Sequence, residues 1–325
     1  MKILSGIQPT GSIHIGNYLG AIKQWIELQK ENDCVFFIAD LHSLTAPYNP
    51  KELQKNIFED AIAYLAAGVD PEKSIFFVQS QIKEHTELCW LLNTVAPLGD
   101  LERMTQYKEK SKQFKENINA GLLDYPVLQA ADILLYKTNA VPVGKDQVQH
   151  IELARTIARK FNQKFGKIFA EPKALLSKET AKILSLNNPK KKMSKSLGPQ
   201  SYISLFEEPE TIKKKIMSAV TDTGKTIKYS PGTKPGISNL LTIYSLFSNK
   251  TIKEIEKEFT GKGYADFKKS LAELLISFLE PFRKKKKELV LREVYVDAVL
   301  DRGAKKARVI ADSTMKEVKK KMGLV

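Results

Sequence analysis

Short apolar runs alternate with longer helical patterns in the first half of the chain. Runs of strand length occur at Ile3–Leu4, Cys34–Ala39 and Ser74–Gln79. From Pro50 to Gly68, apolar residues recur at spacings of three to five, which predicts a helix, and helices are also expected over 18–29 and 146–164. Strands that alternate with helices are typical of βαβ units, so we predict an α/β domain on a parallel sheet.

The pattern changes after Gly198. Strand-like runs disappear and helical periodicity dominates, over 209–220, 236–248, 252–259, 265–280, 287–300 and 305–322. We therefore expect two domains: residues 1–190 with the parallel sheet, and a smaller all-helical domain over residues 191–325.

Charge supports the same division. Residues 1–190 carry a net charge of +2 and residues 191–325 a net charge of +13, which together give the +15 of the chain. A polyanionic partner, such as a nucleic acid, is the expected reason. The many lysines also fit a general lysine bias, but such a bias does not explain their concentration in one half.

Several classes of protein are excluded by composition. There is no apolar run of 18 residues and no signal-like start, and the two cysteines, at 34 and 89, are far apart. We expect a reduced, cytoplasmic protein. Since no histidine, cysteine or carboxylate cluster has the spacing of metal ligands, no metal site is predicted.

Two segments carry chemistry. His14-Ile-Gly-Asn17 follows a glycine-flanked loop and opens a predicted helix, where Gly16 would let a nucleotide approach the helix N-terminus. Lys192-Met-Ser-Lys-Ser196 holds two lysines three apart, flanked by hydroxyls and followed by Gly198, which suits a loop that closes over phosphates.

In this order, these segments resemble the paired signatures of class I aminoacyl-tRNA synthetases. Further segments resemble bacterial-type tryptophanyl-tRNA synthetases: Ser5–Gly11, Met104–Ser111, Gly121–Tyr136, Val141–Gln147 and Lys234–Leu241. The similarity extends from Ser5 almost to the C-terminus.

The resemblance implies a Rossmann-like catalytic domain that binds ATP and tryptophan, and a helical domain that recognises the anticodon, with the last helix packing back on the catalytic domain. It implies a tryptophan–tRNA ligase that forms tryptophanyl-adenylate and pyrophosphate from tryptophan and ATP, then esterifies tRNA(Trp). Mg²⁺ would arrive on the ATP phosphates. A homodimer without membrane attachment is also implied.

The same resemblance assigns the nucleotide site. The catalytic residues would be Lys192, Lys195, Lys110 and His14. ATP would contact the following residues: Gln8, Pro9, Thr10, Gly16, Asn17, Gly144, Lys145, Asp146, Ile183, Lys192, Met193, Ser194, Lys195 and Ser196. Adenylate formation needs positive charge where pyrophosphate leaves and no general base, because the attacking carboxylate is already ionised.

Asp132 is the expected specificity residue. The indole N–H is only a donor, so a fixed acceptor in an apolar setting would recognise it. The remaining residues of the tryptophan site would be Tyr125, Gln129, Gln147, Leu4, Val141 and Val143. Leu4 and Gln129 stand where some family members have phenylalanine and methionine, and Lys145 stands where related enzymes often have glutamate.

Other interpretations stay open. A tyrosine–tRNA ligase is the nearest rival, because an aspartate also accepts from a phenol; a non-catalytic RNA-binding relative is the second. His42, His85 and His150 receive no role. The basic runs Arg283–Lys287 and Lys319–Lys321 are either RNA contacts or solvated helix faces, and Tyr229, Tyr244 and Tyr264 are either stacking partners for bases or core residues.

Overall fold

A computed structural model describes residues 1–11, 13–113, 118–176, 183–224 and 226–325. The chain forms two compact units, and neither is one continuous stretch of sequence. The sheet unit comprises residues 1–12, 21–178 and 292–325, and the helical unit comprises residues 13–20 and 179–291.

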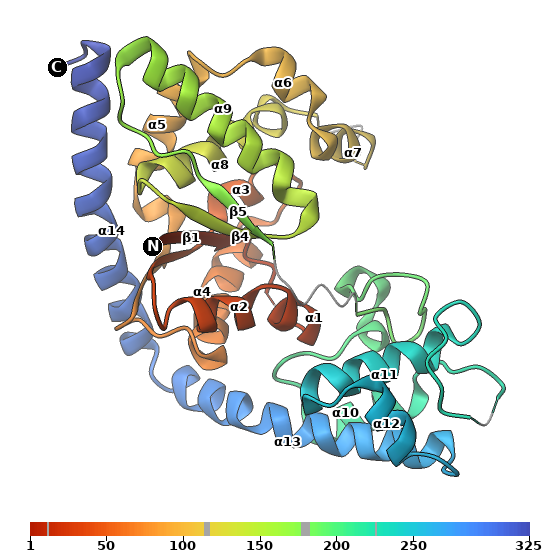
Figure 1. The fold of residues 1–325 in the computed structure, drawn as a ribbon. Helices are drawn as coiled ribbons and strands as arrows, with labels where there is room; N and C mark the ends of the chain where they lie inside the picture. The colour runs from red at the N-terminus through yellow and green to blue at the C-terminus, as the bar shows by residue number, and fades with distance from the viewer. Residues whose placement is uncertain (12, 114–117, 177–182, 225) are drawn as a thin grey trace. The chain divides into compact units, whose positions relative to one another are not determined.

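Within the described residues, one five-stranded parallel sheet forms the centre of the sheet unit (Figure 1). Its order is β3-β2-β1-β4-β5, and its strands are β1 (Lys2–Ile7), β2 (Asp33–Ile38), β3 (Ser74–Val78), β4 (Ala140–Val143) and β5 (Lys173–Leu176). The central strands are continuous apolar runs because both faces of the sheet are covered. The predicted α/β class with a parallel sheet is confirmed.

Helices pack on the sheet and form its core. The helices of this unit are α2 (Lys23–Leu28), α3 (Asp40–Ser43), α4 (Pro50–Ala67), α5 (Glu84–Asn93), α6 (Leu98–Arg103), α7 (Thr105–Gln113), α8 (Ala120–Leu135), α9 (Val148–Phe165) and α14 (Glu293–Met322). One buried apolar cluster joins residues of β1–β4 to α5, α8, α9 and α14.

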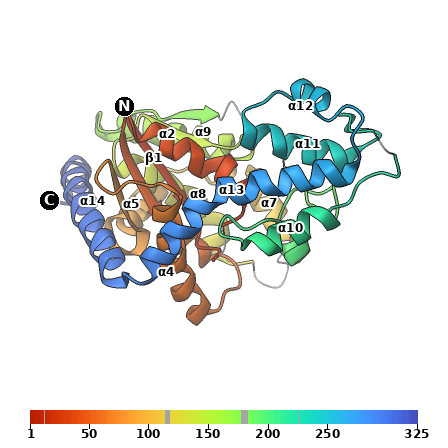
Figure 2. The ribbon, with the colours of Figure 1, turned by 90° about the horizontal axis from the view of Figure 1, so that it is seen from below.

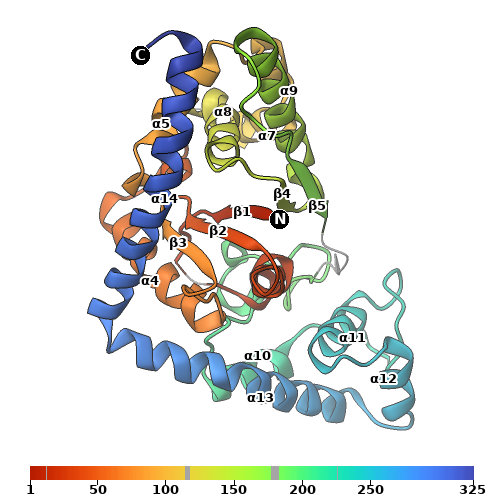
Figure 3. The same cartoon turned by 60° about the vertical axis from the view of Figure 1, so that its left-hand side comes forward.

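The C-terminal helix α14 packs against β3 and α5 (Figure 3). Gly303 permits the approach, because a Cβ at this position would lie 1.8 Å from the carbonyl oxygen of Phe76. Residue 303 therefore has to be glycine if α14 is to keep this distance from the strand.

The helical unit contains α1 (Ile15–Asn17), α10 (Pro209–Ser218), α11 (Pro235–Ser248), α12 (Ile252–Glu258) and α13 (Tyr264–Val290). Helices α10 and α11 lie along α13, and α12 lies against α11 (Figure 2). Tyr244 stacks on Phe267 at the centre of its core, with ring centroids 5.6 Å apart. The expected all-helical second domain is confirmed as the fold of this part.

Two details of the helix prediction are wrong. Helix α13 contains the stretch predicted over 265–280 and continues through Pro281 to Val290, so it also includes the first residues of the stretch predicted over 287–300. The chain turns at Leu291–Arg292, and α14 then continues without a break to Met322. The helix persists past Pro281 because Leu279 and Leu289 are buried on either side of it.

The units divide at other points than residue 190. Residues 13–20 group with the helical unit, where Ile15 N donates to Ile203 O (3.0 Å) and Leu205 N donates to Ile13 O (2.8 Å). The C-terminal residues from Arg292 group with the sheet unit. Periodicity along the chain does not report such pairings, because they join segments almost 190 residues apart.

Candidate active site

Asp132 lies on α8 and is 1% exposed. Among the described residues, three side chains contact its carboxylate. Gln79 Nε2 donates to Oδ1 (2.7 Å), His85 Nδ1 lies 2.6 Å from Oδ1, and His42 Nε2 lies 2.8 Å from Oδ2. His42 lies on α3, Gln79 directly follows β3 and His85 lies on α5, so the fold surrounds one carboxylate with donors from three separate segments.

Asp132 is ionised at neutral pH. Burial raises the pKa of its carboxyl, but the interactions with His42 and His85 outweigh burial and lower the pKa to about 2. The result is a fixed anion that can only accept hydrogen bonds.

His42 joins this carboxylate to other predicted site residues. Its ring lies edge-on to Tyr125, with centroids 6.3 Å apart, and its carbonyl oxygen accepts from Gln8 Nε2 (3.2 Å). The Tyr125 hydroxyl lies 3.0 Å from His150 Nε2, and burial raises the pKa of this phenol to about 12. The structure thus brings Gln8, Tyr125 and Asp132 together around His42.

The remaining residues predicted for tryptophan differ in exposure. Leu4 and Val141 are 3% and 4% exposed and belong to the main apolar cluster. Gln129, Gln147 and Val143 are half-buried. Tyr125 also lines an apolar hollow of about 340 Å³ between α3, α5 and α8.

The glycine-flanked loop after β1 forms one wall of another hollow. Gln8, Pro9 and His42 line this space of about 420 Å³ together with the start of α4. Thr10 N donates to the carboxylate of Asp60 (2.9 Å), which fixes the loop against α4.

The segment after β4 turns tightly. Gln147 N donates to Gly144 O (3.0 Å), and Gln147 Nε2 donates to Asp146 Oδ2 (3.0 Å). A Cβ at residue 144 would lie 2.6 Å from Asp146 Oδ1, so the Asp146 side chain would have to move if residue 144 carried one. Gly144, Lys145 and Asp146 are exposed.

The helical unit brings its two signature segments together. Ser204, which follows the lysine loop, forms a β-bridge with His14, and the rings of His14 and Tyr202 lie 5.9 Å apart. A Cβ on Gly16 would lie 3.0 Å from the His14 ring and 3.9 Å from Met193 Sδ. Segments separated by about 175 residues in the sequence are therefore neighbours here.

The His14 ring has a definite hydrogen-bonding state. Its Nδ1 accepts from Gly16 N (3.1 Å) and Asn17 N (3.3 Å), while the Asn17 side-chain oxygen accepts from His14 N. Burial, with Lys195 and Lys192 nearby, lowers the pKa of His14 to about 4. The ring is therefore neutral, with its proton on Nε2, and Asn17 serves as a cap.

The lysine loop is anchored through its backbone. Met193 N donates to Ile183 O (3.0 Å), and both of these side chains are buried. Lys192 and Ser196 are exposed, Lys195 and Ser194 are half-buried, and the hydroxyls of Ser194 and Ser196 lie 2.9 Å apart. The lysine side chains thus extend from a loop whose backbone is held by this hydrogen bond and by the two buried side chains. The side chain of Lys110, on α7, lies outside the described part of the structure.

Sequence reasoning missed three residues of the Asp132 site: His42, Gln79 and His85. Their positions just after strands or at a helix start gave a weak signal, since ligands bind at the carboxyl ends of parallel strands. From the sequence, His42 and His85 received no role and Gln79 was not considered.

The side chains of the basic run Arg283–Lys287 are less available to bind RNA than their charge suggests. Arg283 is 7% exposed and donates to Ile276 O (2.8 Å), which assigns it to the core. Lys284, Lys285 and Lys287 pair with glutamates. Of the three tyrosines, Tyr244 is buried, the Tyr264 hydroxyl donates to Asp222 (2.8 Å), and Tyr229 is 41% exposed.

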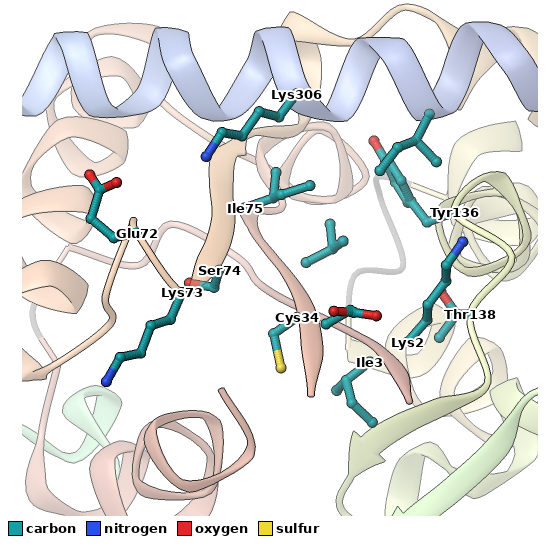
Figure 4. A pocket seen from close by; sticks show the side chains of 13 residues that line it. Lys2, Ile3, Cys34, Glu72, Lys73, Ser74, Ile75, Tyr136, Thr138 and Lys306 are labelled. Carbon is teal, nitrogen blue, oxygen red and sulfur yellow. The ribbon is translucent and has the colours of Figure 1, made fainter. Parts of the chain in front are cut away.

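A separate hollow lies at the opposite edge of the sheet, below α14. Its volume is about 310 Å³, and side chains from the starts of β1, β2 and β3 surround it with Tyr136, Thr138 and Lys306 (Figure 4). The described residues contain no group of three or more histidines, cysteines or carboxylates that could hold a metal ion. Nor does any described helix have the length and apolarity to cross a membrane.

Comparisons with known proteins show what the whole chain is similar to. Residues 1–280 match the family described as tRNA synthetases class I (W and Y). A tryptophan–tRNA ligase of Caldanaerobacter subterraneus subsp. tengcongensis is 50% identical, covering 100% of this chain and 98% of its own.

Solved structures of tryptophanyl-tRNA synthetases are also similar. The Mycoplasma pneumoniae structure has a TM-score of 0.87 at 36% identity, covering 100% of this chain and 98% of its own. The Campylobacter jejuni structure, solved with ADP and tryptophan, has a TM-score of 0.86 at 40% identity, covering 99% of this chain and 100% of its own.

Proposed function

Because this chain belongs to the class I tRNA synthetases of the tryptophan and tyrosine group, we propose that its two units divide one reaction between selecting the amino acid and holding the phosphates. The reaction is that of a tryptophan–tRNA ligase. Tryptophan and ATP give tryptophanyl-adenylate and pyrophosphate, and tryptophan then passes to the 3′ end of tRNA(Trp).

The sheet unit selects tryptophan through Asp132. The observation that carries this proposal is a buried, ionised carboxylate whose neighbours are all donors. An indole N–H satisfies such an acceptor, whereas an amino acid without a ring donor leaves it one hydrogen bond short in a buried site. Tyr125 and Gln147 hold the α-amino group, and Leu4, Gln129, Val141 and Val143 complete the pocket.

The helical unit acts on the phosphates. The tryptophan carboxylate attacks the α-phosphorus of ATP, and negative charge grows on the departing pyrophosphate. Lys192 and Lys195 bind the β- and γ-phosphates, with the Ser194 and Ser196 hydroxyls as further donors and Lys110 as a third cation. His14 donates from Nε2, because its Nδ1 already accepts from the backbone.

The loops of the sheet unit bind the rest of the nucleotide. Gln8, Pro9 and Thr10 form the turn that contacts it, and Gly144, Lys145 and Asp146 contact the ribose. Ile183 and Met193 of the helical unit line the adenine side, and Gly16 with Asn17, also of the helical unit, leaves room at the start of α1. Mg²⁺ enters with ATP and is held mainly by phosphate oxygens and water.

The chain works on tRNA as a homodimer in the cytoplasm. In residues 179–291, lysine and arginine outnumber aspartate and glutamate by 22 to 12, and this excess and the exposed Tyr229 support anticodon binding by the helical unit. Trp90 and Leu98, 73% and 60% exposed on α5 and α6, offer an apolar dimer surface on the sheet unit. Sedimentation equilibrium of the wild-type chain tests the dimer.

The test of the reaction is exchange of labelled pyrophosphate into ATP without tRNA, measured for each of the twenty amino acids. We expect exchange with tryptophan alone. Exchange with tyrosine would keep the chemistry and overturn the role of Asp132. No exchange by folded protein with Mg²⁺ would support the non-catalytic RNA-binding alternative.

A further inference from the structure

A chain of hydrogen bonds runs from Asp132 to Tyr136 through one histidine. Asp132 and Tyr136 lie four residues apart, so they occupy neighbouring turns on one face of this segment. The His85 ring from α5 lies between them, with Nδ1 2.6 Å from Asp132 Oδ1 and Nε2 2.8 Å from the Tyr136 hydroxyl.

The chain is sealed from solvent within its own unit. His85 is 0% exposed, Asp132 1% and Tyr136 2%. The His85 ring is also packed among aromatic rings, with its centroid 5.8 Å from that of Phe37 and 6.0 Å from that of Phe77. On its other side Tyr136 lines the hollow below α14 (Figure 4).

The positions of the protons follow from the partners. An ionised carboxylate accepts only, so His85 Nδ1 carries a proton and donates it. A ring with its single proton on Nδ1 has a lone pair on Nε2, which accepts a hydrogen bond from the Tyr136 hydroxyl. This arrangement satisfies all three groups with a single negative charge on Asp132.

The hydrogen bonds to Asp132 leave one acceptor position of its carboxylate open. A carboxylate has about four lone-pair positions. Gln79 and His85 fill the two of Oδ1, and His42 fills one of Oδ2. Among the described residues, the remaining position on Oδ2 is therefore the one that can receive a further donor.

We propose that His85 and Tyr136 are positioning residues for tryptophan selection, which saturate Oδ1 of Asp132 and leave Oδ2 to accept the indole N–H. The proposal rests on the role of Asp132 given above. Tyr136 acts at a distance: by donating to His85 Nε2, it fixes the tautomer whose Nδ1–H faces the carboxylate. Without it, the other tautomer would turn a lone pair toward the anion.

The test uses three variants of the full-length enzyme in tryptophan-dependent pyrophosphate exchange. Tyr136→Phe removes only the hydroxyl. His85→Asn keeps an amide donor near the place of Nδ1 but loses the link to Tyr136. His85→Leu loses both contacts. We expect KM for tryptophan to rise roughly 5- to 10-fold in the first two and more than roughly tenfold in the third.

Two readouts separate positioning from general damage. We expect kcat and KM for ATP to change by less than roughly twofold, because the phosphate residues are untouched. Equilibrium dialysis with a tryptophan analogue that has sulfur in place of the ring N–H should show equal binding by all variants. Tyr64→Phe removes another buried phenol of this unit and is the matched control, with KM unchanged.

The outcomes are distinct. Equal losses for tryptophan and the sulfur analogue, or a Tyr136→Phe enzyme with wild-type KM, would overturn the inference. If Asp132→Asn alters tryptophan binding while the His85 and Tyr136 variants do not, only the inference fails. If Asp132→Asn is also without effect, the proposed role of Asp132 fails with it.

Discussion

The two units place the charged side chains of their candidate sites in opposite environments, one buried and one accessible to solvent. In the sheet unit, Asp132 is buried and held by donors from three segments. In the helical unit, Lys192 is exposed and Lys195 half-buried, on a loop anchored through Met193 and Ile183. Recognising one ring N–H requires a desolvated acceptor in a fixed position, whereas binding phosphates requires accessible positive charge.

The roles proposed for these groups predict which kinetic constant each one affects. An acceptor that is fully formed before the substrate arrives contributes to binding, and therefore to KM for tryptophan. Cations that meet charge as it develops on the leaving pyrophosphate contribute to the transition state, and therefore to kcat. Two substitutions test this separation, and a third tests the charge state of the helical unit's histidine.

The largest effect is expected for Lys195→Ala. Pyrophosphate exchange should fall by roughly two or more powers of ten, as for loss of one preorganised charge contact. Tryptophan affinity, measured by equilibrium dialysis, should change far less. A parallel loss of both would identify Lys195 as structural and would break the comparison between the units.

Asp132→Asn should have the converse effect. Loss of a hydrogen bond to a charged acceptor is worth about 1.5–3 kcal/mol, so KM for tryptophan should rise roughly 10- to 150-fold. KM for ATP should stay near its wild-type value. Asp297→Asn, at an exposed carboxylate of α14, is the control with wild-type kinetics. Unaltered discrimination between tryptophan and the sulfur analogue in Asp132→Asn would contradict the assignment.

The smallest effect concerns pH and stability. The pKa of His14 is about 4 when folded, against 6.5 for the free side chain, so between these values the unfolded chain binds a proton that the folded chain does not. The free energy of unfolding should therefore fall by about 2 kcal/mol as pH drops from 6.5 to 4. His14→Asn keeps a capping side chain and should lack this part of the decline in urea titrations.

Asp132 should affect the free energy of unfolding over a different, lower pH range. Its folded pKa of about 2 lies below the ordinary value of 3.8, so its contribution is present above about pH 4 and is lost only as pH falls through 2. If His14→Asn keeps the full decline between pH 6.5 and 4, another group causes it, and His14 is not the neutral donor described above.

The sequence predicted the fold better than the site. Apolar runs and helical spacing depend on neighbours within a few residues, so β2, β3 and α4 were found close to their true bounds, whereas the short strands β4 and β5 were not predicted. The helix break was misplaced because Pro281 is a local signal that packing on both sides overrides. The units themselves depend on pairings between distant segments, which no local pattern records.

At the site, Asp132 could be chosen from its apolar surroundings and its resemblance to the family. Its partners could not. His42, Gln79 and His85 reach it from segments 47 to 90 residues away, and a buried histidine between two polar groups has no signature in the sequence. Only the separation of Asp132 and Tyr136 by one helical turn is visible in the chain itself.

The contact between Gly303 and Phe76 also sets an order on the assembly of the protein during its synthesis. The strand is made early, but the helix that covers it is made more than 200 residues later. Until then the apolar side of β3 has no native cover, and the loop to be closed spans more than 200 residues, at an entropic cost that grows slowly with length. The sheet unit therefore completes its folding only after α14 has left the ribosome, whereas residues 179–291 can form their helices before that moment.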